Sequence, residues 1–341
     1  QEVVVLFAVA AATGAKLDDI DGYTVSPDGT LLLIQTSTNR IYRHSHTATY
    51  YIYNIKEGSL VPLSNNGPQQ TPLFSPDGGQ IAFVRDNNIF LVRLFDDNAE
   101  VQVTRDGRRN EIINGIPDWV NEEEFANDRA MVFTADGRQI CWIRYDESLV
   151  KQYSMPLFKG LKPERSEYAD YPGFYTYKYP IAGERNSTCT VWSYDITSGQ
   201  THQLEVPVDA DGYIPRIVMT SDPQRIAVYT MNRHQDCLRI YMANPLTTQS
   251  KMVIEDQVAR YIKDEAISGI QFTDQHILLP SDRDGFMHLY LYSLDGQLVR
   301  QVESGEYEVS GVYGYDERTG DTYYASHENG ATDQRVWVAH K

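Results

Sequence analysis

Three adjacent glutamates, Glu122, Glu123 and Glu124, are the residues of this 341-residue chain whose type and spacing point most directly to chemistry. A solvated acidic helix face is the usual interpretation of such a run of like charges. The other interpretation is a carboxylate pair that holds an ammonium group, because Trp119 and Phe125 on either side exclude water and strengthen a charge-assisted hydrogen bond. Neighbouring helical positions diverge by about 100°. Two carboxylates must therefore bend toward each other to share one ligand.

No serine nucleophile of the α/β-hydrolase type accompanies these carboxylates in the sequence. A Gly-x-Ser-x-Gly elbow needs two glycines four residues apart, and no two of the 23 glycines have that spacing. The sequence also contains no glycine-rich phosphate loop, no His-x-x-x-His pair and no aspartate-rich calcium loop. We therefore expect no catalytic residue, no cofactor and no metal in this chain.

Charge and cysteine content narrow the classes of partner. The 47 acidic and 30 basic residues give a net charge of -17, which disfavours nucleic acid and anionic membranes and makes an amine-bearing partner easier to accommodate. Cys141, Cys189 and Cys237 form no CxxC pair and allow one disulfide at most. The first residues resemble a strand rather than a signal peptide, so we expect a chain that is trimmed at its start.

Short strands joined by a recurrent turn must position the glutamates. The turn occurs as Ser26-Pro-Asp-Gly29, Ser75-Pro-Asp-Gly78 and Thr134-Ala-Asp-Gly137, with weaker copies at residues 217–222, 270–274 and 312–316. Proline presets φ, aspartate bonds back to the backbone and glycine accepts positive φ, so each copy predicts a hairpin. Alternating strands follow most copies, at residues 50–55, 89–93, 191–195 and 288–292. The pattern gives four strands per unit.

Four-stranded units of roughly 40 to 50 residues are the sequence signature of propeller blades. The sequence therefore predicts an all-β fold: one β-propeller domain over residues 1–341, with about six to eight four-stranded antiparallel blades in a closed or incomplete ring. One longer interval holds an insertion at residues 151–179, which we expect to project as a loop. Residues 3–17 are predicted to be two outer strands of a blade, and residues 320–341 a blade that lacks its last strand.

Residues 114–125 interrupt the strand pattern and predict a short acidic helix inserted between blades. Pro117 suits the first helical turn, and Asp118 with the glutamates favours the positive end of the helix dipole. The apolar side chains of this helix, Trp119, Val120 and Phe125, are expected to pack inward.

The sequence Asn-Gly-Ile-Pro-Asp-Trp-Val-Asn-Glu-Glu-Glu at residues 114–124 closely resembles the double-glutamate motif of the dipeptidyl peptidase IV family. The resemblance extends to Arg-His-Ser-His-Thr-Ala at residues 43–48, Tyr-Pro-Ile-Ala-Gly at 179–183 and Arg-Asp-Gly-Phe-Met-His-Leu-Tyr at 283–290. It implies the N-terminal propeller of such an enzyme, with the α/β-hydrolase domain that follows it in the family absent from this chain.

The resemblance also implies a role for each site residue. Glu123 and Glu124 would grip the free α-amino group of a peptide, and Arg43 would hydrogen-bond the carbonyl of its second residue. Glu122 would be the outlying member. A loose alignment matches Tyr261 to an aromatic on the far side of the family's pocket, and we favour the other interpretation, a buried core tyrosine. Because a fixed N-terminus sets the cleavage position, the parent would be a serine exopeptidase that releases Xaa-Pro or Xaa-Ala dipeptides.

Peptides with a free N-terminus and the protein's own C-terminal hydrolase domain are the partners that the resemblance implies. The insertion at residues 151–179 lies where the family's dimerising arm is expected, so a homodimer is a further expectation. The family implies an extracytoplasmic location, in the periplasm or cell envelope. A non-enzymatic, protein-binding propeller and an inactive family member that lost its serine are the alternatives.

Overall fold

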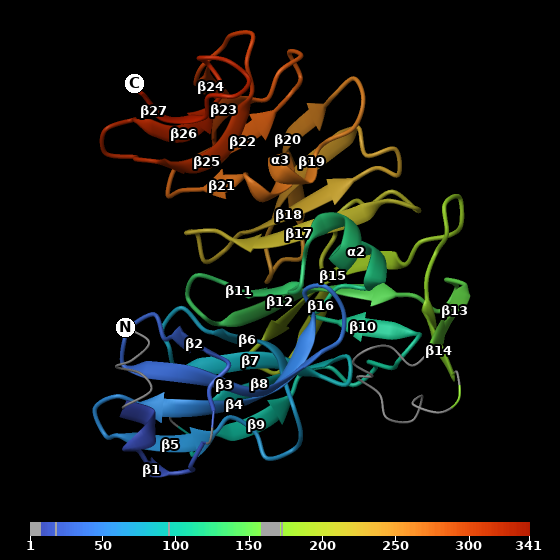
Figure 1. Cartoon of the computed structure of the whole chain (residues 1–341), viewed down its shortest axis with the longest axis vertical. Helices are drawn as coiled ribbons and strands as arrows, with labels where there is room; N and C mark the ends of the chain where they lie inside the picture. The colour runs from blue at the N-terminus through green and yellow to red at the C-terminus, as the bar shows by residue number, and fades with distance from the viewer. Residues whose placement is uncertain (1–7, 18, 95, 158–170, 172) are drawn as a thin grey trace.

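Antiparallel sheets follow one another along the chain as an arc, with the first sheet at one end of the long axis and the last at the other (Figure 1). The computed structural model of the protein describes residues 8–17, 19–94, 96–157, 171 and 173–341. Within these residues six sheets form blades, and one two-stranded sheet projects from the third blade. The prediction of an all-β propeller with four-stranded antiparallel blades is confirmed.

The segment that carries the glutamates is part of the third blade in chain order. The first blade consists of β2 (Gly22–Val25), β3 (Leu31–Arg40), β4 (His46–Asn54) and β5 (Ser59–Pro62), with β1 (Thr13–Gly14) added beside β5. The second consists of β6 (Gln70–Phe74), β7 (Gln80–Arg85), β8 (Asn88–Arg93) and β9 (Ala99–Gln102). The third consists of β10 (Ile112–Asn114), β11 (Met131–Phe133), β12 (Gln139–Asp146), β15 (Thr188–Asp195) and β16 (Thr201–Gln203). Helix α2 (Trp119–Phe125) lies between β10 and β11.

The last three blades continue the arc. The fourth consists of β17 (Tyr213–Met219), β18 (Ile226–Met231), β19 (Cys237–Ala243) and β20 (Ser250–Gln257). Helix α3 (Asp264–Ser268) precedes the fifth blade, which consists of β21 (Gln271–Phe272), β22 (His276–Ser281), β23 (His288–Ser293) and β24 (Leu298–Gln301). The sixth consists of β25 (Val309–Tyr315), β26 (Thr322–Ser326) and β27 (Arg335–Ala339). It has three strands within the described residues and begins at Val309, before the predicted bound at residue 320.

The recurrent turn closes its hairpin through the aspartate and the residue two positions before it. Ser26 Oγ donates to Asp28 Oδ1 at 2.6 Å and accepts from the amide of Leu31 at 2.9 Å. The same pair of bonds recurs around Asp77 and Asp136. Gly29 follows with φ +73°, a left-handed conformation that favours glycine. Each turn is therefore specified within six consecutive residues.

The N-terminal segment differs from the prediction. Residues 8–10 are helical, and β1 is a two-residue strand that pairs with β5 in parallel, so the described part of residues 3–17 does not form two outer strands of a blade. Alanines at positions 8 and 10–12 explain the helix, because alanine has the highest helix propensity. Val9 and Ala12 are buried against Leu32, Ile34 and Leu60 of the first blade.

Hydrophobic side chains join each blade to the next. One cluster spans the first and second blades, a second spans the second to fourth, and a third spans the fourth to sixth and includes Val120 and Phe125 of α2. None of the clusters formed by the described residues contains side chains of both the first and the sixth blade. The core therefore has the arrangement of an arc and supports α2 from the later blades.

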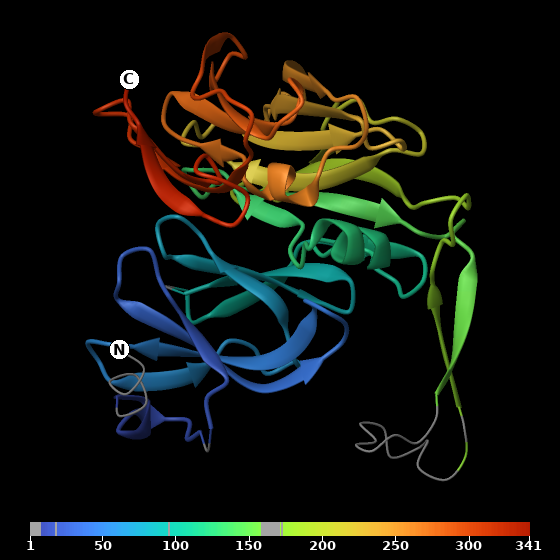
Figure 2. The same cartoon turned by 45° about the horizontal axis from the view of Figure 1, so that its top comes forward.

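The predicted insertion is a hairpin that extends well away from the blades (Figure 2). It consists of β13 (Gln152–Leu157) and β14 (Gly173–Lys178), which pair antiparallel; most of the residues that connect them lie outside the described part of the chain. Tyr153, Met155 and Phe174 on this hairpin are exposed. The insertion is therefore a β-hairpin rather than an irregular loop.

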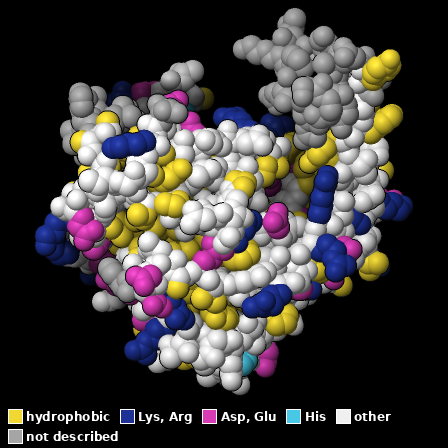
Figure 3. All heavy atoms as spheres, turned by 90° about the horizontal axis from the view of Figure 1, so that it is seen from below, with side chains coloured by type: hydrophobic (Ala, Val, Ile, Leu, Met, Phe, Trp, Pro, Cys, Tyr) yellow, Lys and Arg dark blue, Asp and Glu magenta, His cyan; other side chains and the backbone are white. Residues whose placement is uncertain are grey.

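The surface mixes charged and apolar side chains. On the face seen from below, carboxylates and cations are scattered among exposed apolar groups, without an extended basic area (Figure 3). Within the described residues no helix is long and apolar enough to cross a bilayer. The cysteines Cys141, Cys189 and Cys237 are buried and unpaired, so the single disulfide that their number allows is absent from the structure.

Candidate functional site

Helix α2 begins at a side-chain cap supplied by Asp118. Asp118 Oδ1 accepts hydrogen bonds from the backbone N of Asn121 at 2.9 Å and from its Nδ2 at 2.8 Å. Asp118 Oδ2 accepts one from Ser187 Oγ, on the segment that leads into β15, at 2.5 Å. Pro117 therefore precedes the cap and is not in the first helical turn, where we predicted it. Asp118 contributes a bonded cap in addition to the expected charge at the dipole's positive end.

The C-terminal end of α2 is seated on β17. Phe125 is 2% exposed, and its ring contacts the Tyr213 ring edge-on with 5.4 Å between centroids. The Arg216 guanidinium donates to the Phe125 carbonyl, one of the carbonyls that a helix end leaves without a partner. Arg216 also lies 3.9 Å from Asp264 of α3, and burial lowers its pKa. Distant parts of the chain thus fix both ends of the helix.

Glu122 points into the protein and contacts the tip of the β3–β4 hairpin. Glu122 is 6% exposed. Glu122 Oε1 accepts hydrogen bonds from the backbone amides of His44 at 2.9 Å and Ser45 at 2.8 Å. The hairpin of the first blade is in this way attached to the helix that precedes β11.

Glu123 pairs with Arg43 on the same hairpin tip. Glu123 Oε2 lies 2.5 Å from Arg43 Nε, and the side chains are 21% and 64% exposed, respectively. Contacts with the Tyr42 side chain, and to a smaller extent with Glu123, raise the pKa of Arg43. Glu124 is exposed, and its carboxylate forms no ion pair or hydrogen bond within the described residues. The structure thus brings Arg43 and Glu123 together and leaves Glu124 beside them facing solvent.

Aromatic rings pack around the pair of elements that carries these charges. Trp119 contacts Tyr42 of the hairpin tip at 5.8 Å and Tyr179, next to β14, at 4.3 Å between ring centroids. Tyr179 in turn contacts Tyr153 of β13 at 5.5 Å. The base of the projecting hairpin therefore packs against Trp119 on one side of the glutamate helix. Exclusion of water from the carboxylates by Trp119 and Phe125 stays a prediction.

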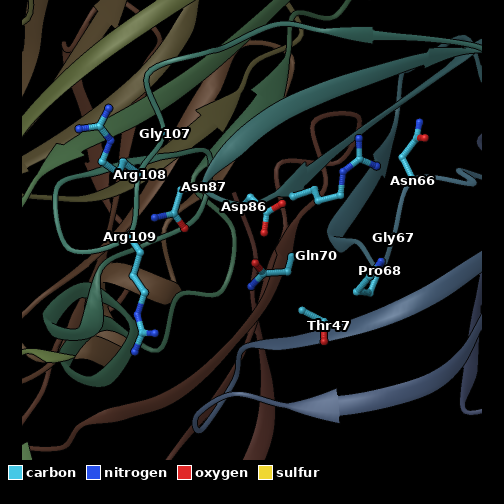
Figure 4. A pocket seen from close by; sticks show the side chains of 11 residues that line it. Thr47, Asn66, Gly67, Pro68, Gln70, Asp86, Asn87, Gly107, Arg108 and Arg109 are labelled. Carbon is cyan, nitrogen blue, oxygen red and sulfur yellow. The ribbon is translucent and has the colours of Figure 1, made fainter. Parts of the chain in front are cut away.

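A polar pocket of about 410 Å³ lies between the first and second blades, next to the β3–β4 hairpin. Thr47 on β4, Gln70 and Asp86 are among its lining side chains, and Figure 4 shows Gln70, Asp86 and Asn87 grouped near its centre. Arg109 extends from another wall toward solvent, with one long contact of 3.5 Å to the Thr176 carbonyl. The pocket offers donors and acceptors to a polar ligand, but the three glutamates do not line it.

Tyr261 lies between β20 and α3 and is 58% exposed. The favoured interpretation as a buried core tyrosine is therefore wrong. Its expected place on the far side of a peptide pocket stays a prediction, since no contact joins it to Arg43 or to the glutamates.

Sequence reasoning missed Ser187 and Arg216, and it gave Glu122 no contact. Asp118 and Asn121 have the three-residue spacing of an N-cap, which a closer reading of the sequence could have used. Ser187 and Arg216 lie 69 and 91 residues from their partners on the helix segment. No local pattern signals contacts over such a distance.

Comparison with known proteins gives consistent matches. The model of the "Dipeptidyl peptidase IV (DPP IV) N-terminal region" matches residues 26–341. A probable dipeptidyl-aminopeptidase B of Emericella nidulans is 32% identical over 321 residues, which is 85% of this chain and 35% of that protein. A probable dipeptidyl peptidase 4 of Aspergillus clavatus is 28% identical over 94% of this chain and 42% of its own length.

A solved structure gives the same result at the level of the fold. The crystal structure of Porphyromonas gingivalis dipeptidyl peptidase 4 is 38% identical, covers 97% of this chain and 46% of its own, and superposes with a TM-score of 0.91. The present chain therefore spans less than half the length of each of these three proteins.

Proposed function

The chain belongs to the dipeptidyl peptidase IV family, whose N-terminal region it represents, and from this premise we propose that it is the substrate-recognition propeller of a serine-type dipeptidyl peptidase. The whole protein would release N-terminal Xaa-Pro or Xaa-Ala dipeptides, with the nucleophile supplied by a hydrolase domain outside this chain. Three relatives that are dipeptidyl peptidases by name support this assignment.

The single observation that carries the proposal is the Arg43–Glu123 pair with Glu124 exposed beside it. An ammonium group has three donors and a carboxylate has four lone-pair sites, so Glu123 can keep Arg43 and still accept from a peptide N-terminus. Arg43 is bonded through Nε. Its side chain is 64% exposed, and its guanidinium would also donate to the carbonyl of the second residue.

The weak net strength of this pair suits a binding role. An exposed ion pair contributes about 0–1 kcal/mol, so rearranging Arg43 and Glu123 around a ligand costs little. Glu124 would turn toward the ammonium as the ligand binds. Because an amine is held at a fixed distance from the cleavage site, peptides without a nearby free N-terminus are excluded.

Substitution in the full-length protein tests the proposal. We expect Glu123→Ala and Glu124→Ala each to lower kcat/KM for an Xaa-Pro p-nitroanilide by on the order of 100-fold, because misplaced substrate loses that much. Glu57→Ala, which changes an exposed glutamate in the β4–β5 turn, is the matched control. Unchanged cleavage by the Glu123 and Glu124 variants, or equal cleavage of N-acetylated substrate by the wild type, would contradict the proposal.

A protein partner on the projecting hairpin is a second proposal, favoured by one observation. Tyr153, Met155 and Phe174 are 47%, 45% and 68% exposed on β13 and β14. We take a second copy of the chain as this partner, because the hairpin lies where the dimerising arm of the family is expected. Sedimentation of wild type and Phe174→Asp tests it: a monomeric wild type would overturn it. An extracytoplasmic location remains part of the same proposal.

A further inference from the structure

Glu122 has a different environment from its two neighbours. It is buried, whereas Glu123 is half-buried and Glu124 is exposed. Its bonds go to backbone amides and not to a side chain that a ligand could displace. A carboxylate that accepts two amide hydrogen bonds in a buried place is held more firmly than an exposed ion pair.

The hairpin tip needs such an external partner. The β3–β4 ladder shifts register between Thr36 and Asn39, and its last pair is Arg40 with His46. The backbone amides of Ile41 and Tyr42 both donate to the Ser45 carbonyl, at 3.0 and 3.3 Å. The amides of His44 and Ser45 have no acceptor within the hairpin, and Glu122 accepts from both.

The position of Arg43 depends on this attachment. Arg43 immediately precedes the two amides that Glu122 binds, and its own side chain is 64% exposed with Glu123 as its ion-pair partner. A tip without an anchor can take many conformations, because loop residues with few buried contacts open at small cost. Arg43 would then be spread over those conformations.

We propose that Glu122 is a positioning residue that fixes the β3–β4 hairpin tip so that Arg43 meets Glu123 and the substrate carbonyl. The inference rests on the proposed function and deepens it: the three glutamates divide into one that holds the protein and two that hold the peptide. Glu122 itself touches no substrate.

Amide hydrogen exchange in the full-length protein tests the attachment without relying on activity. We expect Glu122→Ala to speed exchange at His44 and Ser45 by more than 10-fold, whereas Glu122→Gln, which keeps an acceptor oxygen, stays within a few-fold of wild type. Glu57→Ala is the control and leaves both amides unchanged. Unaltered exchange in Glu122→Ala would overturn the attachment.

A double-mutant cycle tests whether Glu122 acts through Arg43. Measured as kcat/KM on an Xaa-Pro p-nitroanilide, Glu122→Ala should cost about 10-fold or more in wild type, mainly through KM, and less than about 2-fold in an Arg43→Ala background. Equal losses in both backgrounds would overturn the inference. If Glu123→Ala were also fully active, the proposed function would fail, while the exchange result at His44 and Ser45 would still report the attachment separately.

Discussion

The blade turns and the glutamate site are built in opposite ways. In the first turn, Ser26, Asp28 and Leu31 bond to one another over at most five positions. In the site, Glu122 bonds to residues 77 and 78 positions away. The capping Asp118 and the last carbonyl of the helix, that of Phe125, are bonded by residues 69 and 91 positions away. A local turn forms wherever its few residues occur, whereas the site exists only when several blades have assembled. Changes at the site should therefore affect stability and binding together.

The largest expected effect comes from Glu147, a buried carboxylate just after β12. Burial, reinforced by the nearby Asp118, raises the pKa of Glu147 to about 7. Because this pKa is higher in the folded than in the unfolded state, the group destabilises the fold as pH rises from about 4.5 through 7. Glu147→Gln should remove that dependence and raise the free energy of unfolding at pH 8 by up to about 3 kcal/mol.

Urea denaturation of wild type and Glu147→Gln at pH 5 and pH 8 measures this. The gain should be small at pH 5, where the wild-type Glu147 carboxyl is already protonated. A variant whose stability changes by the same amount at both values would show that Glu147 is not the titrating group. Glu111→Gln, at a half-buried glutamate that precedes β10 and pairs with Arg108, serves as the control.

Arg216→Ala should give the next largest effect. The substitution leaves the Phe125 carbonyl without its charged donor and Asp264 without its nearest cation, at a cost of about 2 kcal/mol. The KM of the full-length protein for an Xaa-Pro p-nitroanilide should also rise, because the C-terminal end of α2 loses its attachment to β17. Thermal denaturation and steady-state kinetics on the same preparation measure both. A loss of stability with an unchanged KM would contradict the expectation that changes at the site affect stability and binding together.

Ser187→Ala should have a smaller effect at the other end of the helix. The change removes one hydrogen bond to the buried Asp118 while the two bonds from Asn121 remain, so we expect a loss of about 1–2 kcal/mol. Ser187→Thr, which keeps a hydroxyl, is the paired control. Equal denaturation midpoints for wild type and the alanine variant would show that Asn121 alone is sufficient for the cap.

Gly29→Ala should have the smallest effect and should not reach the site. Gly29 has φ +73°, and a Cβ there meets no atom within 4 Å, so the cost of about 1 kcal/mol is purely one of backbone conformation. The KM of the full-length protein for an Xaa-Pro p-nitroanilide should stay at its wild-type value. A raised KM would mean that a blade turn and the glutamate site are coupled after all.

Local chemistry made much of the fold predictable. Proline, aspartate and glycine in fixed order predicted the hairpins at residues 26–29, 75–78 and 134–137, and alternating apolar residues predicted the strands that follow. In the described part of residues 3–17 the two predicted outer strands do not form, because the alanines at positions 8 and 10–12 favour a helix. A short helix was predicted within residues 114–125, with Pro117 in its first turn. The helix begins two residues later, at Trp119, because Asp118 is its cap.

The sequence by itself determined the all-β class and the repeated four-stranded unit, because both depend on residue types within a short window. Arg43, Glu123 and Glu124 became candidates through the resemblance of residues 43–48 and 114–124 to motifs of the dipeptidyl peptidase IV family. Only the tertiary structure decided that Glu122 is buried, Glu123 half-buried and Glu124 exposed. The physical reason is that adjacent side chains on a helix point in different directions. The β3–β4 hairpin tip of the first blade therefore covers Glu122 and contacts Glu123 only at its edge. The burial of each glutamate thus depends on how the blades are assembled.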